Sequence, residues 1–238
     1  MILACYSYLG DVKLWDIDYQ SHRELISFNI SSSVNSVDGC YTNTSETQLV
    51  LTAAGQDRIT IWNLKLTLEN NVTIGADMFG DATSIDLTPH SPLSVRLVCL
   101  TGPLVVLFTG LTTGCVDVRI VQPDEASKPI QAGVLTGHSD WLNCLDCQKM
   151  FPSGEEMKEC TVDGDNVLLA TGSQDNQIRV WHIQLLDGKE DPGPNLKAIL
   201  FLNIFLNSYL GPTFEVASAP IKYPPIDCSI GKCPLRSR

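Results

Sequence analysis

One short pattern returns four times along this chain and restricts its fold more than any other feature. Three segments run from a turn into alternating apolar residues and reach a tryptophan: 8–17, 55–64 and 173–183, with Trp15, Trp62 and Trp181. A fourth segment, 112–121, has the same alternation with Arg119 in place of the tryptophan. Alternation with period two predicts strands, and its return along the chain predicts a repeat architecture rather than a chemical site.

The spacing of these segments predicts what each repeat contains. The four anchor positions are 47, 57 and 62 residues apart, and a four-stranded propeller blade takes about 40–45 residues. Other short apolar segments supply the further strands: 24–30, 34–40, 48–54, 70–75, 82–88, 104–110, 130–136, 141–147 and 167–172. The excess length is assigned to two insertions, 90–103 and 148–166. Residues 1–186 are therefore predicted to form an all-β fold, a partial β-propeller of about three to four blades, each a four-stranded antiparallel sheet.

The last repeat carries the most specific motif. Gly137 and His138 precede its first strand, and the sequence ATGSQDNQIRVWH, residues 170–182, closes it. This combination resembles the WD40-repeat family, with His182 where a final Asp is usual. In that family a His, a Ser or Thr, an Asp and the Trp form a buried hydrogen-bonded tetrad. The resemblance assigns these roles to His138, Thr171, Asp175 and Trp181.

A physical argument supports a structural role for this tetrad. A buried carboxylate must be paired or hydrogen-bonded, and an imidazole, a hydroxyl and an indole N–H can supply the partners. The second repeat retains Asp57 and Trp62 without an upstream Gly-His, and the third has Thr113 and Arg119 at the corresponding positions. We therefore expect the full network in the last blade only, as a stabilising device and not as an active site.

The order of the features narrows the resemblance. A repeat with Ala-Ala-x-x-Asp before its Trp is followed by one that lacks the Trp, and then by GHSDWL (137–142) and LATGSQDNQIRVW (169–181). Over about residues 8–186 this order is similar to the family of Elongator second subunits. The resemblance implies a non-catalytic scaffold that joins the large scaffold subunit and the acetyltransferase-like subunit of that complex, in the cytoplasm and nucleus. The implied process is modification of the wobble uridine of tRNA, with a link to transcription elongation.

Two other functions stay open from the sequence. An unrelated WD40 adaptor, such as a ubiquitin-ligase substrate receptor or a trafficking scaffold, would carry the same kind of repeats. A propeller enzyme is the other alternative, because function resides in sites placed on a fold and not in the fold itself. The sequence contains no Gly-rich phosphate loop, no nucleophile elbow and no His-Glu-x-x-His motif that would support catalysis. We therefore expect a protein that is not an enzyme and binds no cofactor.

The residues most suggestive of chemistry have simpler explanations. Cys144 and Cys147 form a Cys-x-x-Cys pair, but residues three apart on a strand point to opposite faces. The His-Ser-Asp run at 138–140 is contiguous, so its side chains cannot form a nucleophile, base and orienting acid. The acidic residues of 148–166 lack EF-hand spacing and are expected to form a solvated loop. No catalytic, cofactor-binding or metal-binding residue is therefore assigned.

Charge and hydropathy argue against two kinds of partner. The formal net charge is −11, whereas affinity for nucleic acid comes mainly from clustered Lys and Arg. We therefore expect no direct nucleic-acid binding. The longest apolar run, 196–211, is interrupted by Asn203 and Asn207 and is shorter than the roughly 20 residues of a spanning helix. No membrane association is expected.

Asp140 and Trp141 are the candidate partner-binding residues. In GHSDWL, Leu142 is expected to point into the blade, which places Asp140 and Trp141 near the rim of the propeller face. A partly exposed Trp is the residue type most enriched in interface hot spots. The alternative is that its ring packs against the neighbouring blade.

Residues 187–238 match no repeat. They contain Pro and Ser in place of a further Gly-His or Trp-Asp unit. We expect them to be a divergent C-terminal tail outside the blades, and the chain to be one part of a larger propeller protein.

Overall fold

The fold consists of antiparallel strands throughout the residues that the structure describes. In this computed structural model these residues are 2–17, 22–42, 45–69, 72–101, 103–123, 128–150, 164–186, 195–207 and 211–213. They form the strands β1 to β17 and, within these ranges, no helix. No described segment is therefore a helix able to cross a membrane.

The strands form four antiparallel sheets, named A to D in chain order. Sheet A has the order β1-β2-β3, from β1 (Ile2–Tyr6), β2 (Asp11–Ile17) and β3 (His22–Asn29). Sheet B has the order β4-β5-β6-β7, from β4 (Ser36–Thr42), β5 (Ser45–Ala54), β6 (Arg58–Glu69) and β7 (Val72–Met78), and β8 (Thr83–Asp86) also pairs with β6. Sheet C has the order β12-β11-β10-β9, from β9 (Pro92–Cys99), β10 (Val105–Leu111), β11 (Val116–Val121) and β12 (Ile130–Leu135).

Sheet D extends further along the chain than the repeat motif indicates. Its strands are β13 (Leu142–Met150), β14 (Gly164–Ser173), β15 (Gln177–Leu186), β16 (Asn195–Asn207) and β17 (Gly211–Thr213), in that order. Because β16 pairs with β15 along its length, the boundary expected at residue 186 falls inside sheet D. The motif marks the two middle strands of a sheet, so an outer strand with a plain apolar run carries no sign of membership.

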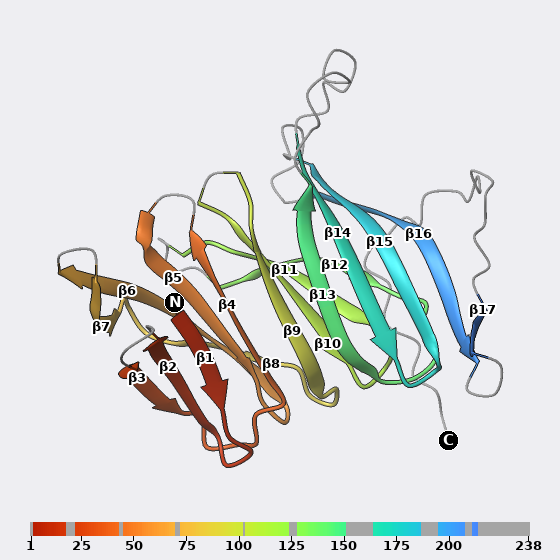
Figure 1. The fold of residues 1–238 in the computed structure, drawn as a ribbon. Coiled ribbons are helices and arrows are strands. Elements are labelled where there is room, and N and C mark those ends of the chain that lie inside the picture. The colour runs from red at the N-terminus through yellow and green to blue at the C-terminus, as the bar shows by residue number, and fades with distance from the viewer. Residues whose placement is uncertain are drawn as a thin grey trace.

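The four sheets stand side by side as blades (Figure 1). Strand β9 contacts both β4 and β13, so the first strands of sheets B, C and D lie next to one another along the inner side. In each of these sheets the chain enters at the inner strand and proceeds outward strand by strand. The architecture is a partial WD40-type β-propeller.

The inner strand of sheet C differs from the expectation. Its expected residues, 82–88, instead form β8 beside β6 of sheet B, and the expected insertion 90–103 contains the inner strand β9. Strand β9 is covered on both faces by neighbouring sheets, and Val95 within it is fully buried. Residues 93–97 of β9 alternate between apolar and polar types, and residues 84–88 do so as well. Alternation alone therefore cannot decide which of the two segments is the inner strand of sheet C.

Two of the three repeat tryptophans, Trp62 and Trp181, lie in the seams between sheets. Trp62 belongs to the apolar cluster that joins sheets A and B, where its ring stacks on Phe28 with 4.7 Å between centroids and 18° between planes. Trp181 belongs to the cluster that joins sheets C and D, which also contains the fully buried Phe108. The recurring Trp is thus a packing residue in both places.

Sheet C carries a polar cluster at the position of the missing tryptophan. Arg119 Nε donates to Asp117 Oδ2 at 2.6 Å, and Gln131 Nε2 donates to Asp117 Oδ1 at 2.5 Å. Asp117 is almost completely buried, so both of its oxygens need such donors. The third repeat therefore has a specific polar interaction at the position where the other repeats have a tryptophan.

Side chains also bind the backbone of the adjacent sheet. Asp38 Oδ2 on β4 accepts a hydrogen bond from the Leu97 N–H on β9 at 2.7 Å. Ser94 Oγ on β9 donates to the Leu142 carbonyl on β13 at 3.3 Å. Sheets B, C and D are therefore joined at their inner strands by directed bonds as well as by apolar packing.

Candidate functional site

The four predicted tetrad residues come from two adjacent strands of sheet D, the turn between these strands and the loop before β13. His138 precedes β13, Thr171 lies on β14, Asp175 lies in the turn to β15, and Trp181 lies on β15. The turn between β14 and β15 is tight because Asn176 adopts the left-handed conformation, with φ of 63°, which Asn tolerates better than most residues. The turn brings the Asp175 carboxylate back toward His138.

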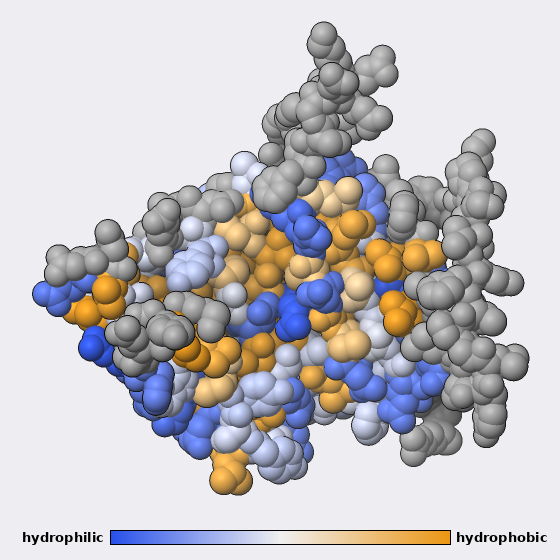
Figure 2. Space-filling model, in the orientation of Figure 1, coloured by the Kyte–Doolittle hydropathy of each residue, from blue (hydrophilic) through white to orange (hydrophobic). Residues whose placement is uncertain are grey.

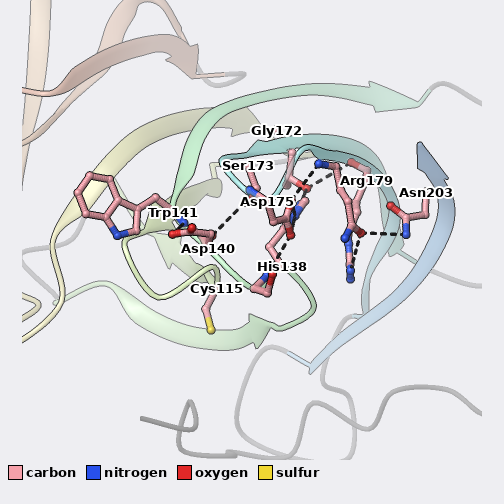
Figure 3. Close-up of polar contacts among 12 residues, drawn as sticks. Cys115, His138, Asp140, Trp141, Gly172, Ser173, Asp175, Arg179 and Asn203 are labelled. Carbon is pink, nitrogen blue, oxygen red and sulfur yellow. Dashed lines mark hydrogen bonds and ion pairs between the residues drawn. The ribbon is translucent and has the colours of Figure 1, made fainter. Parts of the chain in front are cut away.

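Hydrogen bonds join the four side chains in a chain, and Figure 3 shows its His138 and Asp175 members side by side. Trp181 Nε1 donates to Thr171 Oγ1 at 3.1 Å, and Thr171 Oγ1 lies 2.8 Å from His138 Nε2. His138 Nδ1 lies 2.9 and 3.1 Å from the two Asp175 oxygens. The side chains of His138 and Asp175 are 0% and 3% exposed. This is the arrangement that the WD40 resemblance implies.

One protonation state satisfies every member of the chain. Burial lowers the pKa of His138 from its ordinary 6.5, more than the hydrogen bond and charge of Asp175 raise it. A neutral His138 with its proton on Nδ1 donates to Asp175 and accepts the Thr171 O–H at Nε2. For Asp175, burial acts to raise the pKa, but hydrogen bonds from the Ser139 N–H, His138 and the Gln177 N–H outweigh it, and the pKa lies below 3.8.

Acidification is expected to destabilise the fold through His138. Its folded pKa lies below its unfolded value, so the unfolded chain takes up a proton first as the pH falls from 7 to 5.5. One such group lowers the free energy of unfolding by at most about 1.4 kcal/mol per pH unit. Asp175 stays charged across this range and adds nothing to the change. Thermal unfolding midpoints between pH 5.5 and 7.5 should depend less on pH in His138→Gln than in wild type, and equal slopes would contradict this assignment.

Among the described residues of sheet B, the corresponding positions lack this network. In the turn after β5, Asp57 Oδ1 accepts from Arg58 Nε at 2.9 Å at the surface. On β5, Thr52 Oγ1 donates to the Thr60 carbonyl at 3.3 Å, without a His partner. Among the described residues, the complete chain of His, Thr, Asp and Trp occurs in sheet D.

The network fixes the loop that carries the candidate partner-binding residues. Asp175 Oδ2 accepts from the Ser139 N–H at 3.0 Å, and Ser173 Oγ donates to the Asp140 carbonyl at 3.0 Å. The Trp141 N–H donates to Asp140 Oδ1 at 2.8 Å. The main chain of 139–141 is therefore held on the tip of sheet D. Residues 138–141 are called the rim loop below.

The Trp141 side chain lies outside this network. It is 48% exposed, and its ring projects away from His138 and Asp175 (Figure 3). The backbone carbonyl of Trp141 accepts from the Gln174 N–H at 2.9 Å, so the residue is anchored at its main chain while half of its surface faces solvent. A large ring presented by a rigid backbone loses little entropy on binding, and this favours an interface role.

Two residues that support the rim loop carry no sequence signal of their own. Ser173 donates to the loop and also accepts from the Asp175 N–H at 3.1 Å. Gly114, in the turn between β10 and β11, has a φ of 79° and lies so close to the loop that an added Cβ would be 2.6 Å from the His138 carbonyl oxygen. A Ser two residues before an Asp, and a Gly in a Thr-Thr-Gly turn, are too common to indicate this role.

The two thiols of the Cys-x-x-Cys pair lie in different surroundings. Cys144 is exposed, and its Sγ lies 3.9 Å from the Gly172 carbonyl oxygen. Cys147 Sγ lies 4.0 Å from the Leu97 carbonyl oxygen on β9, and burial raises the pKa of its thiol to about 12. Within the described ranges no group of three His, Cys, Asp or Glu side chains has a geometry that could hold a metal ion. Of the expected insertion at 148–166, residues 151–163 lie outside the described residues. Asp165 lies on β14 and not in a solvated loop, because its Oδ1 is 2.7 Å from Lys149 Nζ and its Oδ2 accepts from the Thr101 N–H at 2.6 Å.

No protein-family model matches the chain. The chain is 30% identical over 185 residues to Elongator complex protein 2 of Drosophila melanogaster. Over this region the chain is similar to Elongator complex protein 2. The matched region covers 71% of the chain and 20% of the relative, so the chain spans about a fifth of the length of that relative.

Two solved structures also match this chain, both with TM-scores below 0.5. One is a chain of an active polycomb repressive complex 2 in the basal state, with a TM-score of 0.43 and 15% identity over 75% of this chain and 30% of that one. The other is a chain of BBS1N in complex with ARL6DN, with a TM-score of 0.40 and 10% identity over 90% of this chain and 67% of that one.

Proposed function

We propose that this chain is part of a non-catalytic WD40 scaffold in an Elongator-type complex. Its partners would be the large scaffold subunit and the acetyltransferase-like subunit, in the cytoplasm and nucleus. The observation that carries the proposal is the 30% identity over 185 residues to Elongator complex protein 2. The complex would act on the wobble uridine of tRNA, and this chain would support its assembly rather than the chemistry.

The negative charge of the chain agrees with a role in assembly rather than in binding tRNA. A formal net charge of −11 opposes binding to the phosphate backbone of tRNA. Both ring nitrogens of His138 make hydrogen bonds, one to Thr171 and one to Asp175. This supports a structural role for His138. Contacts to tRNA and catalysis would then belong to other subunits.

The rim loop is the surface that we assign to a partner. Trp141 offers a half-exposed ring on a fixed main chain, and Asp140 beside it is exposed on the same loop. Aromatic residues at the centre of an interface supply most of its binding energy, and neighbouring charges select the partner. A partner surface with an apolar pocket and a basic residue next to it would fit these two side chains.

Trp141→Ala is expected to weaken binding of the partner subunit without unfolding the chain. Truncation of a hot-spot Trp costs about 2 kcal/mol or more, which is a factor of roughly thirty in Kd. The chain would be tagged, co-expressed with each of the two partner subunits, and co-purified, and the Kd would be measured by titration. The thermal midpoint should stay within a degree or so of wild type, because the ring lies outside the apolar clusters.

Tyr8→Ala is the matched control for this experiment. Tyr8 is 79% exposed in the turn between β1 and β2, so it also removes an aromatic ring from the surface. Equal binding by Trp141→Ala and wild type would contradict the role of the rim loop. Failure of the unaltered chain to bind either subunit, alongside stable binding to a cullin adaptor or a coat component, would support the unrelated WD40 adaptor instead.

A further inference from the structure

The outer strand of sheet B presents a free edge with exposed apolar side chains. Among the described strands, β7 pairs with β6 alone and ends the order of the sheet. Several apolar residues of β7 and its neighbours are largely exposed: Leu68 45%, Val72 54%, Ile74 38%, Met78 43% and Phe79 48%. Figure 2 shows hydrophobic residues next to hydrophilic ones at the end of the molecule where Figure 1 places β6 and β7. Together β7 and the adjoining Phe79 are called the β7 edge.

The hydrogen-bonding direction of β7 follows from one bond. The Phe79 N–H donates to the Asn63 carbonyl at 2.7 Å, and the register pairs Met78 with Leu64 and Asp77 with Lys65. Opposed residues in an antiparallel pair alternate between exchanging two hydrogen bonds and exchanging none. Asp77 therefore bonds to β6, and the N–H and C=O groups of Ala76 and Met78 point away from β6, toward the free edge.

The two faces of this edge differ in chemistry. Met78 and Ala76 share a face with their cross-strand partners on β6, Leu64 and Leu66, which belong to the apolar cluster between sheets A and B. The opposite face carries the exposed Asp77. An additional strand beside β7 would therefore place alternate side chains against apolar and charged surroundings.

Charge on the opposite face is predominantly negative. Lys65 and Asp77 are opposite each other in the register. Glu69 lies four residues beyond Lys65 on β6 and therefore on the same face. Asp81, just after β7, is also exposed. A partner strand would be favoured if its side chains on this face were basic.

We propose that the β7 edge binds an extended segment of a partner protein by strand addition, with apolar residues that alternate with Lys or Arg. Outward N–H and C=O groups of Ala76 and Met78 supply the main-chain bonds, and exposed apolar and acidic side chains select the alternating sequence. The rim loop is not involved, so this surface and the one assigned above are independent. An edge of this kind otherwise favours uncontrolled pairing, which a bound segment prevents.

A defined peptide tests the proposal with the full chain. The probe is an acetylated and amidated eight-residue peptide that alternates valine and lysine, labelled for fluorescence anisotropy. Hydrogen exchange measured in parallel should show protection of the Ala76 and Met78 amides when the peptide is bound. The amides of Asp77 and Phe79, already bonded to β6, should change little.

Met78→Pro is the decisive variant. Its N–H points outward, so proline removes no bond to β6 and is tolerated at a sheet edge. Loss of that donor and of the apolar side chain is expected to weaken peptide binding by about tenfold or more. Met78→Ala keeps the N–H and should lose only about threefold. Thermal unfolding of both variants checks that sheet B is intact.

A second control does not alter the protein. The same peptide with every backbone nitrogen methylated keeps its side chains but cannot donate main-chain hydrogen bonds, and it should not bind. Equal binding by the methylated peptide, unchanged binding by Met78→Pro, or no binding of the parent peptide at millimolar concentration would overturn the proposal. Protection of Ala76 and Met78 by raised protein concentration alone, with a dimer in light scattering, would also overturn it, because the occupant would then be a second copy.

Discussion

Asp175→Ala is expected to lower the free energy of unfolding by about 3–5 kcal/mol. The change leaves the N–H groups of Ser139 and Gln177 and the Nδ1–H of His138 without the acceptor that they share. The side chain is 3% exposed, so water does not replace it at full strength. The loss should appear as a lower midpoint in urea unfolding followed by tryptophan fluorescence.

Two further variants separate this network from a generic loss of charge. Asp175→Asn keeps one carbonyl acceptor and should recover part of the loss. Asp57→Ala changes the corresponding turn of sheet B, where the carboxylate only pairs with Arg58 at the surface, and should leave the midpoint unchanged. A similar midpoint for Asp175→Ala and Asp57→Ala would show that the tetrad is not a stabilising unit.

Gly114→Ala is expected to destabilise the chain by about 2–4 kcal/mol and also to displace the rim loop. A non-Gly residue at a φ of 79° is strained, and the new Cβ would lie 2.6 Å from the His138 carbonyl oxygen and 2.9 Å from that of Asp140. Neither oxygen can retreat freely, because the loop is fixed by Asp175 and Ser173. Weaker binding of the partner subunit is therefore expected although Trp141 itself is unaltered.

Gly80→Ala is the control for backbone strain alone. Gly80 has the same φ of 79°, but an added Cβ would meet no atom within 4 Å. It should cost only the left-handed penalty of about 1–2 kcal/mol and leave partner binding intact. Equal losses of stability for the two glycine variants, with unaltered binding, would contradict a supporting role of Gly114 for the loop.

The sequence predicts the middle of each blade well and its margins poorly. Strands β2, β6, β11 and β15 are marked by alternation of apolar and polar residue types, and in β11 the polar members are the paired Asp117 and Arg119. Strand β9 alternates over residues 93–97 much as residues 84–88 do, so the pattern does not identify it as the inner strand, and it is mistaken for an insertion. Strand β16 follows a segment outside the described residues and has a continuous apolar run, so nothing in its sequence ties it to β15.

The candidate site shows the same limit. The tetrad can be located from the sequence because a Gly-His, a Thr and an Asp before a Trp are specific residue types at characteristic positions. Supports such as Ser173 and Gly114 depend on which loops meet in space, and this is set by the packing of sheet C against sheet D. The β7 edge depends on the absence of a neighbouring strand among the described elements, which no local pattern records.

The hydrogen bonds that join neighbouring sheets at their inner strands affect which substitutions the chain can accept. Asp38 and Ser94 each reach a main-chain group, the Leu97 N–H and the Leu142 carbonyl. Every residue but proline offers that N–H, and every residue offers that carbonyl. The receiving positions can therefore change their side chains over evolutionary time as long as the apolar volume is kept. Substitutions at Asp38 and Ser94 should be tolerated far less often than substitutions at the positions that they contact.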